Sequence, residues 1–230
     1  MKSIKIGLVV VLLLTFSACN TSSEKHETAK ALKTSFTKMK SLNQIIDVKI
    51  ESHNKGIIKQ TNKKLELINT YKNGEIQDFR SKEITSDSDK KPTQMEFVNL
   101  GDVAQIKLGD VVYEQNTKVA YPLHYGNLIA WLQANVDNQK LLLTSENELV
   151  YQGSEAEVID SFIEHFKLSL SSIDDLEVKL NLSMKLSRKR DLIEILEYKL
   201  SSNYDKNSVS VEGLGIFREM NQPLEIKLFR

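Results

Sequence analysis

Cysteine, proline and glycine are all scarce in this chain. Among 230 residues there is a single cysteine, Cys19, with three prolines and nine glycines. One thiol excludes an internal disulfide, so packing and hydrogen bonds have to hold the fold together. The low content of proline and glycine excludes a collagen-like or low-complexity chain. The length is sufficient for one domain with a substantial core.

Neither sign of charge dominates the sequence. Lys and Arg total 31, and so do Asp and Glu, which gives a formal net charge of zero. Nucleic-acid binding needs a clustered positive surface, so this balance argues against a nucleic-acid partner.

Sequence motifs of enzymes and of metal sites are also missing. The chain has no Gly-x-Ser-x-Gly nucleophile elbow, no phosphate-binding loop and no His-Glu-x-x-His pair. Its four histidines, His26, His53, His124 and His165, are scattered without ligand spacing. We therefore expect no catalytic residues, no cofactor and no metal, and a protein that is not an enzyme.

No apolar run is long enough to cross a bilayer. The run from Ile6 to Leu14 is shorter than the roughly 20 residues that a spanning helix needs. A basic start before it and small residues after it are typical of a secretory signal peptide. The pair Ser17-Ala18 before Cys19 resembles the lipobox of bacterial lipoproteins, although Phe16 stands where that family usually has Leu. The resemblance implies removal of residues 1–18 and a diacylglyceryl group on the cysteine.

Lipid on Cys19 would anchor the chain to the extracytoplasmic face of the cell membrane, or to the outer membrane of a bacterium that has two. Several acyl chains together give a lasting anchor. Residues 19–27 are polar and are expected to form a flexible tether. The alternative is an ordinary secreted protein with a cysteine at this position.

Hydrophobic periodicity predicts an opening helix followed by strands. Apolar residues recur at steps of three and four from Glu24 to Lys40, and the period then changes to two. A hairpin turn is indicated at Asn73-Gly74. A capping box at Ser154 to Glu157 predicts the start of a further helix. Other strands are predicted within Ile46–Ile50, Ile58–Tyr71, Met95–Val119, Leu141–Tyr151 and Leu224–Leu228.

The most regular alternation lies between Leu176 and Leu186, where six apolar residues alternate with polar ones. This pattern predicts an unusually long strand with one buried face, and Leu192–Leu200 is predicted to return beside it. Hairpin-linked strands with separated helices indicate an α+β fold. We expect a long curved antiparallel sheet, a half-barrel, with a few helices packed on its concave face.

This order of elements resembles the LolA/LolB-like half-barrel lipoproteins, and within them the Gram-positive relatives of the LppX/LprG group. The resemblance rests on Cys19, the opening helix with Lys38–Leu42, the hairpin Leu176–Leu200 and the ending Phe217–Ile226. It implies a single half-barrel domain over residues 28–230. It also implies an apolar cavity between sheet and helices, in which members with known roles hold acyl chains or lipidated proteins.

Two sets of residues can serve a ligand in such a protein. An apolar set is predicted to line the cavity, because methionine and aromatic side chains adapt to acyl chains. A dry packed core is the alternative for the same residues. The basic turn is predicted to contact anionic head groups, with a solvated turn as its alternative. The residues are Phe97, Trp131, Phe162, Phe166, Leu180, Leu182 and Met184 for the cavity and Arg188, Lys189 and Arg190 for the head groups.

The leading hypothesis is therefore a cell-envelope lipoprotein that binds or carries a hydrophobic ligand, such as a lipid, an acyl chain or a lipidated molecule. Its partners would be the membrane and that ligand. The alternative is a non-catalytic protein-interaction lipoprotein with a filled core, for example a scaffold, a sensor or an immunity factor.

Overall fold

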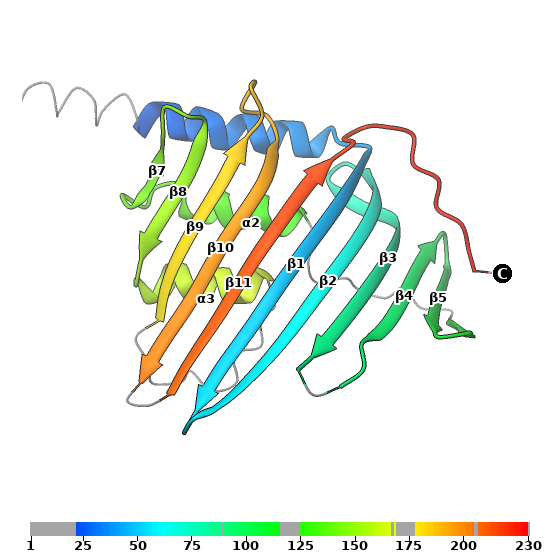
Figure 1. Ribbon diagram of the computed structural model, residues 1–230. Helices are drawn as coiled ribbons and strands as arrows, with labels where there is room; N and C mark the ends of the chain where they lie inside the picture. Colours follow the sequence, from blue (N-terminus) through cyan, green and yellow to red (C-terminus); the bar gives the residue numbers. More distant parts are fainter. Residues whose placement is uncertain are drawn as a thin grey trace, which may run out of the picture.

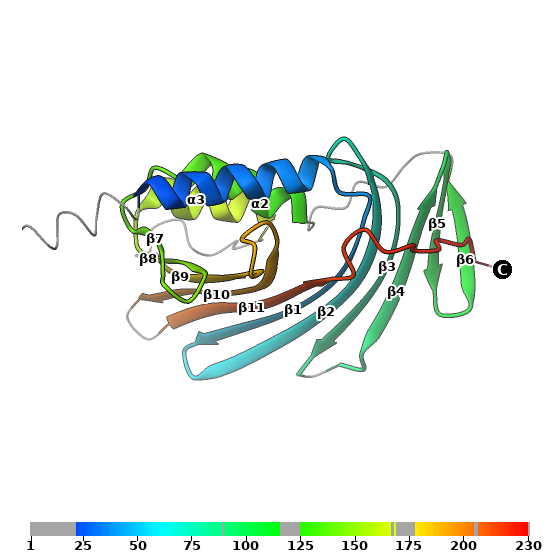
Figure 2. The same cartoon turned by 90° about the horizontal axis from the view of Figure 1, so that it is seen from above.

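The computed structural model describes residues 22–88, 90–115, 125–166, 168, 178–204 and 207–229. In these ranges an antiparallel sheet of eleven strands curves around a layer of helices without closing, as Figures 1 and 2 show. The α+β half-barrel predicted from the sequence is therefore confirmed.

The order of strands across the sheet is β6-β5-β4-β3-β2-β1-β11-β10-β9-β8-β7. Consecutive strands are neighbours within β1–β6 and within β7–β11, whereas β6 and β7 lie at opposite edges, with α2 between them in the chain. Each neighbouring pair is antiparallel. The first and last strands of the chain therefore lie side by side in the middle of the sheet. The strands are β1 (Ser41–Asn54), β2 (Ile57–Lys72), β3 (Glu75–Asp87), β4 (Thr93–Leu100), β5 (Val103–Leu108), β6 (Val111–Gln115), β7 (Leu141–Leu143), β8 (Glu148–Gly153), β9 (Val178–Leu186), β10 (Ile193–Tyr204) and β11 (Asn207–Arg218).

The long hairpins form where the sequence indicated them. Asn73 and Gly74 both have positive φ, at 56° and 81°, as the tight turn between β2 and β3 requires. In β9 the apolar residues from Leu180 to Leu186 are buried, and the polar residues between them are exposed or partly exposed. The predicted strands at Leu176–Leu186 and Leu192–Leu200 are confirmed over the described residues, which begin at Val178.

Three helical segments lie on the concave face of the sheet (Figure 2). They are the N-terminal helix, described over residues 22–37, with α2 (Tyr125–Asn135) and α3 (Ala156–Phe166). The helix predicted from Glu24 to Lys40 is present over residues 22–37, so the part of the predicted tether from residue 22 to residue 27 is helical. The buried ammonium of Lys25 donates to the carbonyls of Asn138 (2.8 Å) and Leu141 (2.9 Å). These hydrogen bonds hold the first turns of the helix against the β7 side of the sheet.

The prediction of a strand at Leu224–Leu228 is wrong. Residues 222–229 have no regular secondary structure, and they extend from the end of β11 towards β5 (Figure 1). The Phe229 amide donates to Oε1 of Gln105 (2.7 Å), and Arg80 lies over the Phe229 ring. Gln105 and Arg80 share the outer face of the sheet. Because the segment lies against side chains instead of beside a strand edge, its alternating pattern does not produce a ladder.

Candidate functional site

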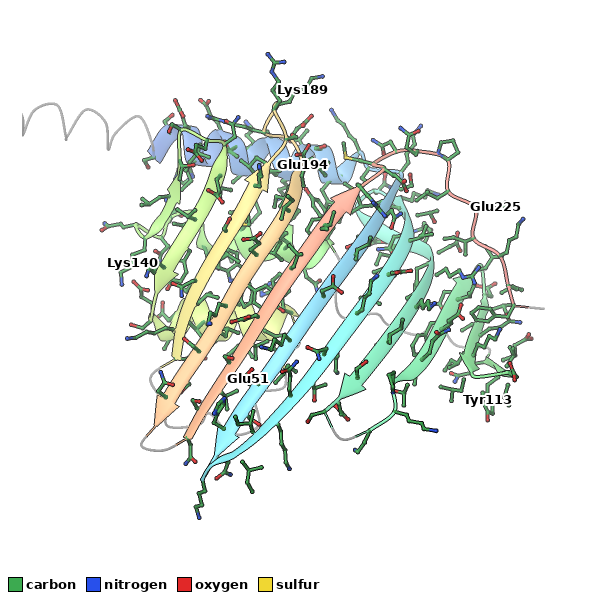
Figure 3. The ribbon with its side chains drawn as sticks, in the orientation of Figure 1. Glu51, Tyr113, Lys140, Lys189, Glu194 and Glu225 are labelled. Carbon is green, nitrogen blue, oxygen red and sulfur yellow. The ribbon has the colours of Figure 1, made fainter. Side chains whose placement is uncertain are left out.

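The helices cover only one part of the concave face. In Figure 2 they lie over the strands from β7 to β1, and Phe36 of the N-terminal helix contacts Tyr71 of β2; no helix of the described ranges lies over β4, β5 or β6. We call the strands β7–β11 with their helices the covered half, and β3–β6 the open half. Figure 3 shows the two outer edges of the sheet, with Lys140 beside β7 and Tyr113 on β6.

Six of the seven predicted cavity residues lie in the core of the covered half. Phe162 of α3 packs its ring edge-on against Trp131 of α2, at 5.7 Å between centroids, and stacks on Phe166 at 4.4 Å. Tyr198 of β10 meets the same ring at 5.1 Å. All of these side chains are buried, as are the predicted residues of β9, which are Leu180, Leu182 and Met184. The described side chains here pack against one another, so the ligand-lining role of these six residues stays a prediction.

The seventh residue, Phe97 of β4, lies elsewhere. It is partly buried, and it pairs with Ser81 of β3 and Ile106 of β5. Leu67, which also pairs with Ser81, is a core residue on the concave face. Phe97 therefore faces the concave side, in the half that no described helix covers.

Sheet register places further apolar side chains beside Phe97. Because side chains alternate between faces along each strand, residues paired across strands share a face. One row joins Phe97 to Ile106 and Tyr113, and the next joins Met95, Leu108 and Val111. We call this set the open apolar face; it consists of Met95, Phe97, Ile106, Leu108, Val111 and Tyr113.

The open apolar face is accessible to an extent that is unusual for large apolar side chains. Leu108 is 42% exposed, Val111 52% and Tyr113 51%, whereas Met95, Phe97 and Ile106 are partly buried. Contiguous apolar surface rimmed by polar residues is typical of a binding site. The sequence indicated strands here, but it did not indicate that their apolar side would lack a helix.

Buried polar groups connect the start of α2 to the sheet and lie along the middle strands β1 and β2. The Tyr125 amide donates to Oε1 of Gln44 (2.9 Å), and the Ile193 amide donates to the Tyr125 hydroxyl (2.9 Å). Asn69 donates to the Tyr71 hydroxyl (2.8 Å), and burial raises the pKa of Tyr71 to about 12. These phenols remain protonated at neutral pH, so they join strands and helices as uncharged hydrogen-bonding groups.

The basic turn lies far from the open apolar face. Arg190 forms an ion pair with Glu24 of the N-terminal helix (3.2 Å), and its Nε donates to Asn147 in the turn before β8 (2.7 Å). Arg188 and Lys189 are exposed at the tip. Figure 3 shows Lys189 at one end of the strands and Tyr113 on a different edge. The basic turn and the open apolar face are therefore separate sites, and the head-group role of these cations stays a prediction.

A shallow groove of about 1290 Å³ lies on the opposite, outer face of the sheet. Val48 and Tyr198 point into the core on the concave face, and their neighbours in the strands, such as Lys49 and Lys199, point the other way. The groove therefore lies on the outer face. Lys199 and Glu212 form an ion pair within it (2.6 Å), so its polar residues satisfy one another in part. Sequence reasoning did not indicate this groove, because its charged residues are those expected on a solvated sheet face.

The described residues contain neither a cluster of metal-ligating side chains nor a membrane-spanning helix. Within them no group of three or more His, Cys, Asp and Glu side chains is arranged to hold a metal ion. No helix of the same ranges is long and apolar enough to cross a membrane. Cys19 and His124 lie outside the described residues.

Comparison with known proteins yields similarities of fold alone. No protein-family model and no curated sequence matches the chain. LprF from Mycobacterium bovis is similar over 90% of this chain and 98% of its own, with 9% identity and a TM-score of 0.43. A DUF1329 family protein from Desulfovibrio piger covers 89% of this chain and 95% of its own (10% identity, TM-score 0.25). An S-type phycobiliprotein lyase from Guillardia theta covers 81% and 91% (8% identity, TM-score 0.24).

The sequence resemblance to half-barrel lipoproteins is thus confirmed at the level of fold by the curved, unclosed sheet and the helices on its concave face. Identities of 10% or less with these TM-scores assign no ligand.

Proposed function

We propose that this protein is a cell-envelope lipoprotein that binds a hydrophobic ligand, such as a lipid or an acyl chain, on the open apolar face. The proposal rests on six apolar side chains that sheet register places side by side in two rows on the concave side of β4–β6. Three of them are about half exposed. Burying one methylene contributes about 0.8 kcal/mol, so an acyl chain lying on this face gains affinity with length. The protein acts as a binder or carrier and not as an enzyme.

The open half has the stability that a binding surface needs. Its outer side is held by the C-terminal segment, where Arg80 and Lys107 lie 5.3 Å and 5.8 Å from the centroid of the Phe229 ring. Val98, which faces the outer side between them, is fully buried. The strands can therefore keep their shape without a helix on the concave side.

Binding is tested with a fluorescent fatty acid and the whole chain, using two neighbouring residues of β6 as a matched pair. Val111 lies on the open apolar face, whereas Val112 faces the outer side of the same strand and is also exposed. Val111→Lys is expected to weaken binding about tenfold or more, because it places a charge where several methylenes would lie. Val112→Lys should leave affinity within about twofold. Equal effects of the two changes would contradict the proposal.

The anchor is a separate part of the proposal. Lipid on Cys19 would hold the half-barrel at the extracytoplasmic face of a membrane, with the N-terminal helix leading into the domain. In cells fed with labelled palmitate, the protein should carry label, and Cys19→Ala should lose both the label and the membrane association. Label that persists in the variant would refute lipidation at this residue.

A protein-interaction lipoprotein is the second candidate, and the packed core of the covered half favours it, since six predicted cavity residues are buried there. Lipid extraction of the pure protein separates the two functions. Recovered acyl chains support the ligand binder. If no lipid is recovered and the fatty-acid probe does not bind, the open apolar face is better explained as a protein-docking surface.

A further inference from the structure

The hairpin of β1 and β2 ends in an apolar tip whose side chains are not packed on either face of the sheet. The turn is formed by Lys55 and Gly56, whose φ angles of 49° and 85° suit a two-residue hairpin connection. Ile57 and Ile58 follow at once and pair with Asn54 and His53. Because consecutive strand residues point to opposite faces, the two isoleucines present apolar surface on both sides of the tip.

These two residues are the most exposed large hydrophobic side chains that the structure describes. Ile57 is 63% exposed and Ile58 60%. β2 pairs with β3 from Thr61 onward, and the Ser88 amide after β3 still donates to the Gln60 carbonyl (3.0 Å), so residues 57–59 extend beyond the neighbouring chain. Folding of the chain therefore leaves both side chains in water, at a point that contributes nothing to the open apolar face.

Cations flank the isoleucines. Lys55 and Lys59 are exposed, and neither forms an ion pair within the described ranges. The tip is also held in place, because the Lys55 amide donates to Oδ1 of Asn207 at the start of β11 (3.3 Å). Two adjacent aliphatic side chains between two lysines thus project from a fixed, narrow support.

We propose that this tip, Lys55–Lys59, inserts into the interfacial region of an anionic lipid bilayer. Two side chains are far too few for a specific protein interface, which buries about 800 Å² on each partner. They suit shallow insertion, in which aliphatic groups enter the acyl boundary and lysines stay at the level of the head groups. Anionic lipids add an electrostatic attraction for each lysine.

The tip and the basic turn lie at opposite ends of the long strands. Figure 1 shows the β1–β2 hairpin reaching away from the N-terminal helix, and Figure 3 shows Glu51 of β1 far from Lys189. Insertion of the tip is thus a membrane contact separate from the lipid on Cys19, and it does not depend on the ligand proposed above.

Co-sedimentation with vesicles tests the tip directly. The chain from Asn20 onward, which lacks both the apolar run Ile6–Leu14 and the lipid-bearing Cys19, is mixed with vesicles of phosphatidylcholine and phosphatidylglycerol in equal parts. Ile57→Asp combined with Ile58→Asp should reduce the bound fraction about tenfold. Leu142→Asp changes another exposed apolar residue, on the edge strand β7, and should reduce binding less than about twofold. Equal loss in both variants, or no vesicle binding by the parent chain, would overturn the proposal.

Tryptophan fluorescence of two variants, one at the tip and one at β7, locates the membrane contact. Ile57→Trp should shift its emission to the blue on adding these vesicles, whereas Leu142→Trp should not; an unshifted Ile57→Trp emission would reject insertion. Replacing Lys55 and Lys59 by Gln should weaken binding to the mixed vesicles and not to phosphatidylcholine alone. Fatty-acid binding is expected to be unchanged in the variants of the tip, so failure of this proposal and failure of the ligand proposal can be told apart.

Discussion

The two halves of this sheet bury apolar surface in opposite ways. In the covered half, the concave side of β7–β11 is closed by helices, and Phe162 and Trp131 are fully buried between them. In the open half, the concave side of β4–β6 carries the exposed Tyr113 and Val111 beside the buried Asn99 and Ala104, and the C-terminal segment with Phe229 covers the outer side.

This difference separates stability from binding within one continuous sheet. A residue packed on all sides contributes to the free energy of unfolding, and a residue left half in water contributes little to it. The covered half therefore holds the fold, and the open half keeps apolar surface that a ligand can use. Substitutions in the two halves should separate these roles.

The largest expected difference compares an aromatic residue from each half. Phe162→Ala should lower the free energy of unfolding by about 3–5 kcal/mol, because it removes a ring that contacts Trp131, Phe166 and Tyr198. Tyr113→Ala should change it by about 0.5 kcal/mol or less. Urea titration followed by circular dichroism measures both. A large loss for Tyr113→Ala would mean that the open half is as tightly packed as the covered half.

A smaller effect is expected where a glycine of β11 lies beneath an aromatic ring. A Cβ on Gly213 would come within 2.1 Å of Cε1 of Tyr198, a ring held against Phe162. Gly213→Ala should therefore cost about 1–3 kcal/mol of unfolding free energy, since the ring cannot move without opening the core. Gly101→Ala is a control in the open half with no atom within 4 Å of the new methyl group, although its φ of 58° adds backbone strain. A fall of less than about 0.5 kcal/mol in Gly213→Ala would contradict the close packing of β11 against the Tyr198 ring.

Much of this fold could be predicted from local sequence. The alternation in β9 and the Asn73-Gly74 turn are local features, because side-chain periodicity and turn conformation depend on a few adjacent residues. The helix that begins at Ala156 is likewise indicated locally, by the capping box at Ser154 to Glu157. Such signals establish an α+β chain of hairpins with one apolar side.

The position of the open apolar face could not be predicted in the same way. It depends on which strands lie beneath the helices, and that follows from the pairing of β1 with β11, residues far apart in the chain. Phe97 and Phe162 are both apolar aromatic residues in the sequence, yet Phe97 is only partly buried at the border of the core and Phe162 is fully buried. Exposure of Ile57 and Ile58 likewise depends on where β3 stops pairing with β2.

The smallest expected effect concerns a carboxylate at the β7 edge of the covered half. Glu155 accepts hydrogen bonds from Lys140 (2.6 Å) and from the Tyr151 hydroxyl, and these hold the pKa of its carboxyl at about 2, below the ordinary value of 4.5. Because the folded pKa is lower than the unfolded one, the stabilising contribution is complete above pH 4.5 and is lost as the pH falls towards 2. Glu155→Gln should therefore flatten the acid limb of a stability–pH profile measured by urea titration between these values. Lys140→Met should flatten it in part, since the Tyr151 hydrogen bond remains. An unchanged acid limb in Glu155→Gln would show that this group does not couple protonation to folding of the covered half.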